Sequence, residues 1–146
     1  MSGERSAFRP RGGYRVFRRI ATRWQDNDVY GHVNNSVYYG WFDTAVNTHL
    51  IEANVLDIMA GPVIGLVVET GCRYARAVAY PQVVEAALRA AYVGRSSVRY
   101  EIGLFTDGSA DAAAEGFFVH VYVDRKTRRP IDLSADWRAV LQAIAN

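Results

Sequence analysis

Residues 26–54, DNDVYGHVNNSVYYGWFDTAVNTHLIEAN, combine a polar loop with an amphipathic segment, and the predicted fold depends on them. The loop part includes Gly31 and shows no hydrophobic period. From about residue 35 to 54, side chains recur at helical spacing in two sets, Val37, Trp41, Ala45 and Tyr38, Phe42, His49. This segment is therefore predicted to form one long helix.

A capping residue is expected where the helix begins. The side-chain oxygen of Asn34 or Asn35 is suited to accept from the free N–H groups of the first turn. Gly40 costs a helix about 1 kcal/mol relative to alanine, so we expect it to serve close packing.

Alternating hydrophobicity predicts strands on both sides of the helix. Residues 14–24 alternate as a half-buried strand does, with arginines largely at odd positions. Four more strand-like runs lie near residues 63–76, 82–94, 96–107 and 113–124. One face of the third run is marked by Val98, Tyr100, Ile102 and Leu104, and one face of the fourth by Phe117, Val119, Val121 and Val123.

The links between these runs are turn-like, at Tyr80-Pro81, Gly94 and residues 107–109, and residues 134–146 are predicted to form a short helix capped by Ser134. Short links favour an antiparallel meander, because parallel pairs need a long crossover. Only the long helix is large enough to cover one face of the sheet. The predicted architecture is α+β, a curved five-stranded antiparallel sheet wrapped around one long central helix. Its exposed strand edges favour association into at least a dimer.

Composition limits the class of protein. The chain has 146 residues, which suits one domain, predicted at 14–146 after a flexible N-terminal tail at 1–13. It has neither an apolar run long enough to span a membrane nor a segment of the kind a secretory signal needs. The single cysteine, Cys72, fits a reducing compartment, and we expect the cytoplasm. A net charge of +2 does not indicate a nucleic-acid partner.

The loop that leads into the long helix predicts a site for carbonyl chemistry. A helix N-terminus offers free N–H groups at the positive end of the helix dipole. A carbonyl oxygen docked there is polarised, and the same groups stabilise a developing oxyanion. The carboxylate of Asp28, returned by the loop, is then placed to attack that carbon or to direct water at it.

The same residues resemble a known family. The pattern D-x-D-x-x-G-H-V-N-N at 26–35, followed by an aromatic-rich helix, is similar to the 4-hydroxybenzoyl-CoA thioesterase-like branch of the hotdog-fold acyl-CoA thioesterases. The likeness extends from about Arg15 to Leu141, and includes the segments 94–97 and 121–124. It implies a hotdog fold, hydrolysis of an acyl-CoA thioester, and a dimer or dimer of dimers.

The resemblance also implies roles for particular residues. Asp28 is the catalytic carboxylate, as nucleophile or as general base, and the backbone N–H of Asn35 is the oxyanion donor. Asp26 is expected to be structural. We give His32 a secondary role, in contacting substrate or bracing the loop. The leaving thiol has a pKa near that of cysteine, about 8.5, so it departs without a dedicated acid.

Further residues are candidates for substrate binding. Asp43 on the helix faces either the acyl pocket or solvent, and the placement of Glu69 is open. Coenzyme A carries phosphates, which guanidinium groups bind well, so Arg95 and either Arg128 or Arg129 are candidates at the pocket mouth. The hydroxyls of Ser96 and Ser97 face the pantetheine or serve the turn.

The sequence shows no motif for zinc binding or for nucleotide binding. His32, His49 and His120 have no zinc-ligand spacing, and no glycine-rich nucleotide motif is present, so no cofactor is expected beyond the coenzyme A of the substrate. Three alternatives stay open, namely an acyl-acyl-carrier-protein thioesterase, a hydratase or dehydratase on the same scaffold, and a non-catalytic acyl-CoA-binding protein.

Overall fold

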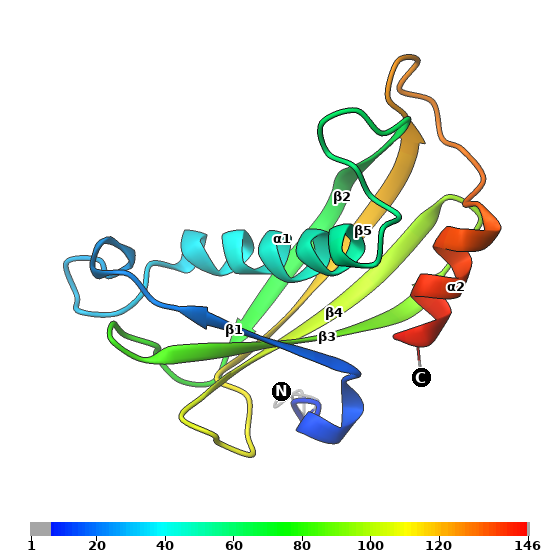
Figure 1. The fold of residues 1–146 in the computed structure, drawn as a ribbon. Coiled ribbons are helices and arrows are strands. Elements are labelled where there is room, and N and C mark those ends of the chain that lie inside the picture. Colours follow the sequence, from blue (N-terminus) through cyan, green and yellow to red (C-terminus); the bar gives the residue numbers. More distant parts are fainter. Residues whose placement is uncertain (1–6, 146) are drawn as a thin grey trace, which may run out of the picture.

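A five-stranded antiparallel sheet curves around helix α1 in the computed structural model, which describes residues 7–145 (Figure 1). The strands are β1 (Val16–Ala21), β2 (Val63–Tyr74), β3 (Val83–Val93), β4 (Ser97–Thr106) and β5 (Ala114–Asp124). The helices are α1 (Asn35–Glu52) and α2 (Ala135–Ala143), with short 3-10 turns at Arg11–Gly13 and Trp24–Asp26. The predicted α+β architecture is confirmed, and the predicted bounds of the last four strands are correct to within two residues.

The order of the strands corrects one prediction. The sheet order is β1-β3-β4-β5-β2, so the meander includes only β3 to β5, and β2 pairs with β5 at the far edge. The connection 75–82 is long enough to cross from one side of the sheet to the other. It passes the start of α1, where the N–H of Val33 donates to the carbonyl of Val78 at 2.7 Å. This crossing places the end of β2 beside the loop that contains Asp28.

The first strand is shorter than the predicted 14–24. It ends at Ala21, and Trp24 lies in a 3-10 turn with 78% of its surface exposed. The alternation continues in the sequence beyond Ala21, but β3, the neighbouring strand, begins at Val83, opposite Ala21. The β1–β3 ladder therefore ends at Ala21, because β3 offers no further residue for pairing.

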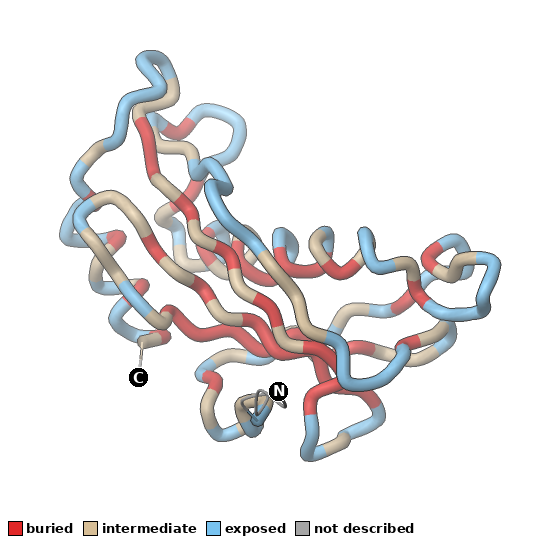
Figure 2. Tube along the Cα trace, turned by 180° about the vertical axis from the view of Figure 1, so that it is seen from behind, coloured by how far each residue is buried: buried red, intermediate tan, exposed pale blue. Residues whose placement is uncertain are grey.

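The core lies between α1 and the inner face of the sheet. Phe42 is fully buried, and its ring occupies the space that a side chain at Gly116 would need, 2.3 Å from an ideal Cβ. Leu104 and its alternate neighbours on β4 are fully buried as predicted. Figure 2 shows the buried residues concentrated in the central strands. Removing a side chain as large as that of Phe42 costs about 3–5 kcal/mol.

The position of Gly40 differs from its prediction, and the inner face of β5, which the sequence left open, is defined by the structure. Gly40 lies on an exposed face of α1, and a Cβ there meets no atom of the described chain within 4 Å, so within one chain it does not serve close packing. On β5 the residues facing α1 are Gly116, Phe118, His120 and Tyr122, whereas Phe117 and Val119 lie half-buried on the outer face. Both faces of β5 are apolar, so alternation alone does not identify the inner one.

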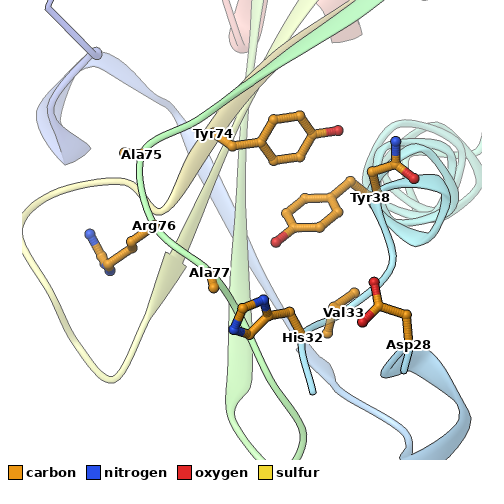
Figure 3. Close-up of a pocket in the computed structure, with 9 residues that line it drawn as sticks. Asp28, His32, Val33, Tyr38, Tyr74, Ala75, Arg76 and Ala77 are labelled. Atoms are coloured by element: carbon orange, nitrogen blue, oxygen red, sulfur yellow. The ribbon is translucent and has the colours of Figure 1, made fainter. Parts of the chain in front are cut away.

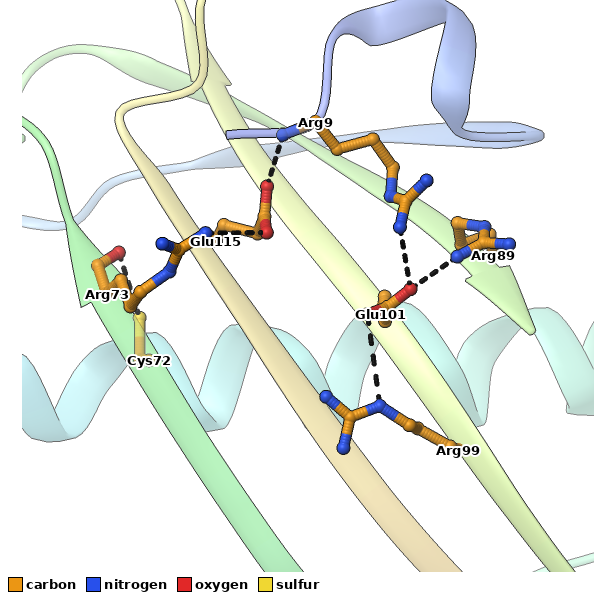
Figure 4. Close-up of polar contacts among 7 residues, drawn as sticks. All are labelled: Arg9, Cys72, Arg73, Arg89, Arg99, Glu101 and Glu115. Atoms are coloured by element: carbon orange, nitrogen blue, oxygen red, sulfur yellow. Dashed lines mark hydrogen bonds and ion pairs between the residues drawn. The ribbon is translucent and has the colours of Figure 1, made fainter. Parts of the chain in front are cut away.

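The outer face of the sheet is partly covered by the N-terminal segment. Tyr14 packs edge-on against Phe105, and Phe8 adds to the same small cluster. The backbone N–H of Arg9 donates to Glu115 at 2.6 Å, and its guanidinium pairs with Glu101 at 3.1 Å (Figure 4). The flexible tail was predicted at 1–13; residues 1–6 lie outside the described residues, but residues 7–13 make these defined contacts because the sheet offers acidic partners.

The C-terminal helix closes one end of the core. Ser134 caps it as predicted, accepting from the N–H of Trp137 at 3.3 Å. Trp137 packs on Tyr122 with ring centroids 4.6 Å apart. Neither α2 nor any other helix of the described residues has the length and apolar content needed to cross a bilayer.

Candidate active site

The loop before α1 is a small hairpin that brings Asp28 and His32 together. The N–H of Asp28 donates to the carbonyl of His32 at 2.8 Å, and the N–H of Gly31 donates to the carbonyl of Asp28 at 3.1 Å. Gly31 has φ +82°, a conformation that favours glycine. The Asp28 carboxylate accepts from the N–H of Tyr30 at 2.8 Å, which fixes its orientation. The sequence D-V-Y-G-H therefore folds into a tight turn with both polar side chains at its base.

Asp26 stabilises this hairpin through contacts with residues on either side of it. Its side chain is 1% exposed and accepts from the backbone N–H of Arg23 at 2.7 Å and from the Arg23 guanidinium at 2.8 Å. Its carbonyl accepts from the N–H of Asn34 at 2.9 Å. All of these contacts are to the chain itself, so Asp26 fixes the loop between β1 and α1.

Helix α1 begins with a free donor. Asn34 is the cap, and its side-chain oxygen accepts from the N–H of Ser36 at 2.9 Å. The N–H of Asn35, the first helical residue, has no acceptor among the described residues. It stands at the positive end of the helix dipole, where partial negative charge is stabilised.

These groups line one pocket of about 380 Å³ (Figure 3). Asp28, His32 and Asn35 lie on its polar side. The remaining lining residues come from the start of α1 and from the segment after β2, and they are Val33, Tyr38, Tyr74, Ala75, Arg76 and Ala77. A loop carboxylate, an imidazole and a free helix N–H therefore face a common space with an aromatic wall.

The aromatic wall consists of two tyrosines. The rings of Tyr38 and Tyr74 meet edge to face with centroids 5.0 Å apart. Burial raises the pKa of both hydroxyls, so both remain neutral in the physiological range. They offer apolar surface and hydrogen bonds but no base, which leaves Asp28 and His32 as the bases of the pocket.

Several predicted substrate-binding residues lie at the other end of the sheet in the same chain. Arg95 and Ser96 lie in the turn between β3 and β4, Ser97 begins β4, and Arg128 lies in the turn after β5. Arg95 is exposed and forms an ion pair with Asp132 at 2.6 Å. One chain therefore does not bring these residues to Asp28.

Asp43 and Glu69 are also outside the pocket of the single chain. Asp43 is on the exposed face of α1, where partial burial raises the pKa of its carboxyl. Glu69 pairs across the ladder with Val119 and so lies on the outer face of the sheet. The acyl-pocket placement of Asp43 is not seen within one chain.

The segment that closes the pocket was not predicted from the sequence. Tyr74, Ala75, Arg76 and Ala77 reach the start of α1 only because β2 pairs with β5, and local sequence patterns do not encode that pairing. Arg76 is the cation among the lining residues, and its guanidinium donates to the carbonyl of Asp111 at 2.9 Å. Among residues 7–145, no three His, Cys, Asp or Glu side chains are grouped so that they could hold a metal ion.

The curved antiparallel sheet and the long helix that it wraps define a hotdog fold. A sequence profile of the thioesterase-like superfamily matches residues 22–143, and the chain belongs to that superfamily. This confirms the predicted thioesterase relationship at the level of the superfamily and supports a thioester hydrolase, while the 4-hydroxybenzoyl-CoA thioesterase-like branch stays a prediction. No protein with a curated description matches the sequence.

Solved structures show the same fold. The PA5185 protein of Pseudomonas aeruginosa PAO1 is 52% identical, with a TM-score of 0.91 over 94% of this chain and 96% of that one. PA2801 of the same species, described as a putative thioesterase, is 27% identical, with a TM-score of 0.80 over 86% and 97%. A DHNA-CoA thioesterase from Staphylococcus aureus is 20% identical, with a TM-score of 0.78 over 86% and 87%.

Proposed function

We propose that the protein hydrolyses acyl-CoA thioesters to the free acid and coenzyme A, with Asp28 as the catalytic carboxylate. The observation that carries the proposal is that Asp28 and the free N–H of Asn35 line one pocket. The thioester carbonyl oxygen accepts from that N–H, which stabilises the negative charge that develops on it. The carbonyl carbon then lies between the helix start and the carboxylate.

Two mechanisms use Asp28 at that carbon. As nucleophile, its oxygen bonds to the carbonyl carbon, the C–S bond breaks, coenzyme A leaves as a thiolate, and water hydrolyses the resulting mixed anhydride. As general base, it takes a proton from water, whose oxygen forms the new bond. A single turnover in ¹⁸O-water identifies the nucleophilic route when label enters the Asp28 side chain, because this requires water to open the mixed anhydride at the Asp28 carboxyl carbon. Opening at the acyl carbon labels only the product acid, as the general-base route does.

His32 contributes by position. Its backbone carbonyl holds the N–H of Asp28, and its ring lies at the pocket (Figure 3). We assign the ring a contact with substrate that supports Asp28. A His32→Gln substitution is expected to lower the rate less than Asp28→Asn does.

The phosphates of coenzyme A need cationic partners, and a second copy of the chain supplies them. We propose that two chains associate through β2, since antiparallel pairing of two β2 strands turns the far end of one sheet toward the pocket of the other. Arg128 of the partner subunit then approaches the pocket mouth. The partner's Arg95, Ser96 and Ser97 lie at the same end of the partner's sheet. Asp43, on the exposed face of α1, faces the partner in this arrangement. The enzyme is expected to act in the cytoplasm without a cofactor.

The test is thiol release from acetyl, medium-chain, long-chain and aromatic acyl-CoAs. A subset is expected to be hydrolysed, and Asp28→Asn is expected to abolish the reaction without changing the melting temperature. Asp124→Asn is a matched control, because Asp124 also accepts backbone N–H groups of its own turn, at 2.8 Å from Lys126. Undiminished activity of Asp28→Asn removes Asp28 from catalysis.

Two other results would assign the protein a different function. Hydrolysis of acyl-carrier-protein thioesters with no turnover of the coenzyme A forms makes the protein an acyl-carrier-protein thioesterase. Tight binding of acyl-CoA with no turnover of either form makes it a binding protein.

A further inference from the structure

A hollow of about 300 Å³ lies on the outer face of the sheet, where β4, β5 and β2 run side by side with α1 behind them (Figure 4). We propose that this hollow is a phosphate-binding site, formed by the guanidinium groups of Arg73 from β2 and Arg99 from β4. Its described lining residues differ throughout from those of the Asp28 pocket, so phosphate binding here does not depend on thioester hydrolysis.

The register of the strands brings the two arginines to one hollow. Arg73 pairs with Glu115 across the β2–β5 ladder. Phe117, two residues further along β5, lies on the same face and pairs with Glu101 on β4. Arg99 is two residues from Glu101 and therefore also faces this side. Two guanidinium groups from the strands on either side of β5 thus line the same hollow (Figure 4).

The Arg99 guanidinium is oriented by an aromatic ring. Its carbon Cζ lies 4.1 Å from the centroid of the Phe117 ring. That ring occupies the space beside Gly71, 2.8 Å from an ideal Cβ there, so a side chain at residue 71 would displace it. Among residues 7–145 the carboxylate paired with Arg99 is that of Glu101, at 3.8 Å from Nε, which is too long for a hydrogen bond. The Arg99 N–H groups are therefore oriented and remain available to a ligand.

Positive charge exceeds negative charge around the hollow. Four guanidinium groups form ion pairs with only two carboxylates, those of Glu101 and Glu115. The four belong to Arg9, Arg73, Arg89 and Arg99. Glu69 also lies on this face of the sheet, but it forms no ion pair within the described part of the chain. The cluster therefore has a surplus of two positive charges, and the Arg89 side chain is only 7% exposed, where water screens charge poorly.

Buried donors beside the cluster show the same imbalance. The Tyr14 hydroxyl and Nε of Arg9 are buried, and neither has a hydrogen-bond partner in the range 7–145. The Tyr14 ring covers Gly103, which pairs with Glu115 in the β4–β5 ladder. Burial raises the pKa of Tyr14, so its hydroxyl keeps its proton. Donors thus outnumber acceptors in this part of the sheet, which favours a ligand that supplies acceptors.

Phosphate fits both the charge and the geometry. Its dianion carries the two negative charges that balance the surplus, and its oxygens accept from guanidinium forks in pairs. A single carboxylate balances only half of that charge. The side chains of Arg73 and Arg99 are 41% and 38% exposed, so the hollow is open to solvent. It therefore admits either the free ion or a phosphate group at the end of a larger molecule.

Titration with inorganic phosphate tests the site without relying on activity. The side-chain Nε–H signals of Arg73 and Arg99 are followed by NMR at neutral pH and constant ionic strength, with chloride as the reference anion. Phosphate is expected to shift both signals in a saturable way. Arg73→Gln and Arg99→Gln should each weaken binding at least about tenfold, as read from the signal of the remaining arginine. Arg99→Lys keeps the charge but not the fork and should weaken it less.

Arg19→Gln is the matched control, because Arg19 is an exposed arginine on β1, at the other edge of the sheet. Its affinity for phosphate should equal that of the wild type. Adenosine 3′,5′-bisphosphate distinguishes the source of the phosphate: tighter binding than inorganic phosphate indicates a nucleotide, and equal or weaker binding indicates the free ion. Shifts that do not saturate, shifts that chloride reproduces, or an unchanged Kd in a folded Arg99→Gln variant overturn the site.

Discussion

The two edges of the sheet differ in how they meet solvent. Strand β1 carries Arg18 and Arg19 in its six residues, and Arg18 forms an ion pair with Glu52 on α1. Strand β2 presents Leu66, Val67 and Val68 instead. Charges on an edge discourage strand pairing, because a second chain would bring like charges together. One edge is therefore protected and the other is available, and the candidate active site lies at the end of the available edge.

Placing charge on β2 is expected to have the largest effect. The double variant Val67→Lys/Val68→Lys should be a monomer by light scattering, and its kcat/KM on acyl-CoA should fall at least about tenfold because the pocket loses Arg128 of the partner subunit. Both residues are exposed in one chain, so its circular dichroism should be unchanged. Ala21→Lys on β1 is the matched control and should remain a fully active dimer. A fully active monomer contradicts a shared site.

Acid is expected to weaken the β2 side. His120 lies opposite Val67 in the ladder and is 2% exposed, and burial lowers its pKa to about 4. The unfolded chain binds a proton there near pH 6.5, so this stability is complete above pH 6.5 and is lost as the pH falls toward 4, by up to about 3 kcal/mol. Behind β1 the corresponding residues are Ala86 and Leu88, which do not titrate.

Urea unfolding between pH 7.5 and 4.5 measures this effect. His120→Gln is expected to lose less stability than the wild type over that range, because it has no proton to gain on unfolding. If both proteins lose the same amount, His120 does not set the acid sensitivity of the β2 side.

Each of the two α-helices begins with a capping side chain, and the loss of either cap is expected to have an intermediate effect. Asn34 caps α1 beside the pocket, and Ser134 caps α2, which packs against β3. Asn34→Ala and Ser134→Ala should each lower the free energy of unfolding by about 1 kcal/mol. Only Asn34→Ala should also lower kcat, because it disturbs the position of the Asn35 N–H. Equal kcat values for the two variants would separate catalysis from the start of α1.

The smallest effect is expected on the β1 edge. Arg18→Ala removes a partly exposed ion pair with Glu52, and such pairs contribute less than about 1 kcal/mol. The variant should remain a dimer with unchanged kcat/KM. Dissociation of Arg18→Ala would show that β1, and not β2, takes part in association.

The local features of the fold were predictable because local physics sets them. Helical spacing and a capping asparagine predicted a helix from about residue 35 to 54, and α1 is found at Asn35–Glu52. Alternation predicted the last four strands. The Asp28 loop and the helix start were likewise adjacent in sequence. For the same reason Ser134 was predicted as a cap, and Asn34 was one of the two candidates for the cap of α1.

Long-range pairing was not predictable from these patterns. Alternation does not say which strand pairs with which, so the β2–β5 ladder and the place of Tyr74 in the pocket were missed. The two apolar faces of β5 left its inner side undetermined. The phosphates of coenzyme A suggested Arg95 and Arg128 as candidates, but not the fact that, in one chain, they lie at the opposite end of the sheet.

The most direct test of a shared site mixes two inactive chains. One carries Asp28→Asn, and the other carries Arg128→Glu, whose carboxylate should repel the phosphates of coenzyme A. After refolding together, each hybrid dimer holds one intact site, made of Asp28 from one chain and Arg128 of the other. We predict recovery of about a quarter of the wild-type activity, since random pairing makes half of the dimers hybrids with one site each. Hybrid dimers that form and show no recovered activity would contradict the shared site, because Arg128 of one chain would then not serve the pocket of the other.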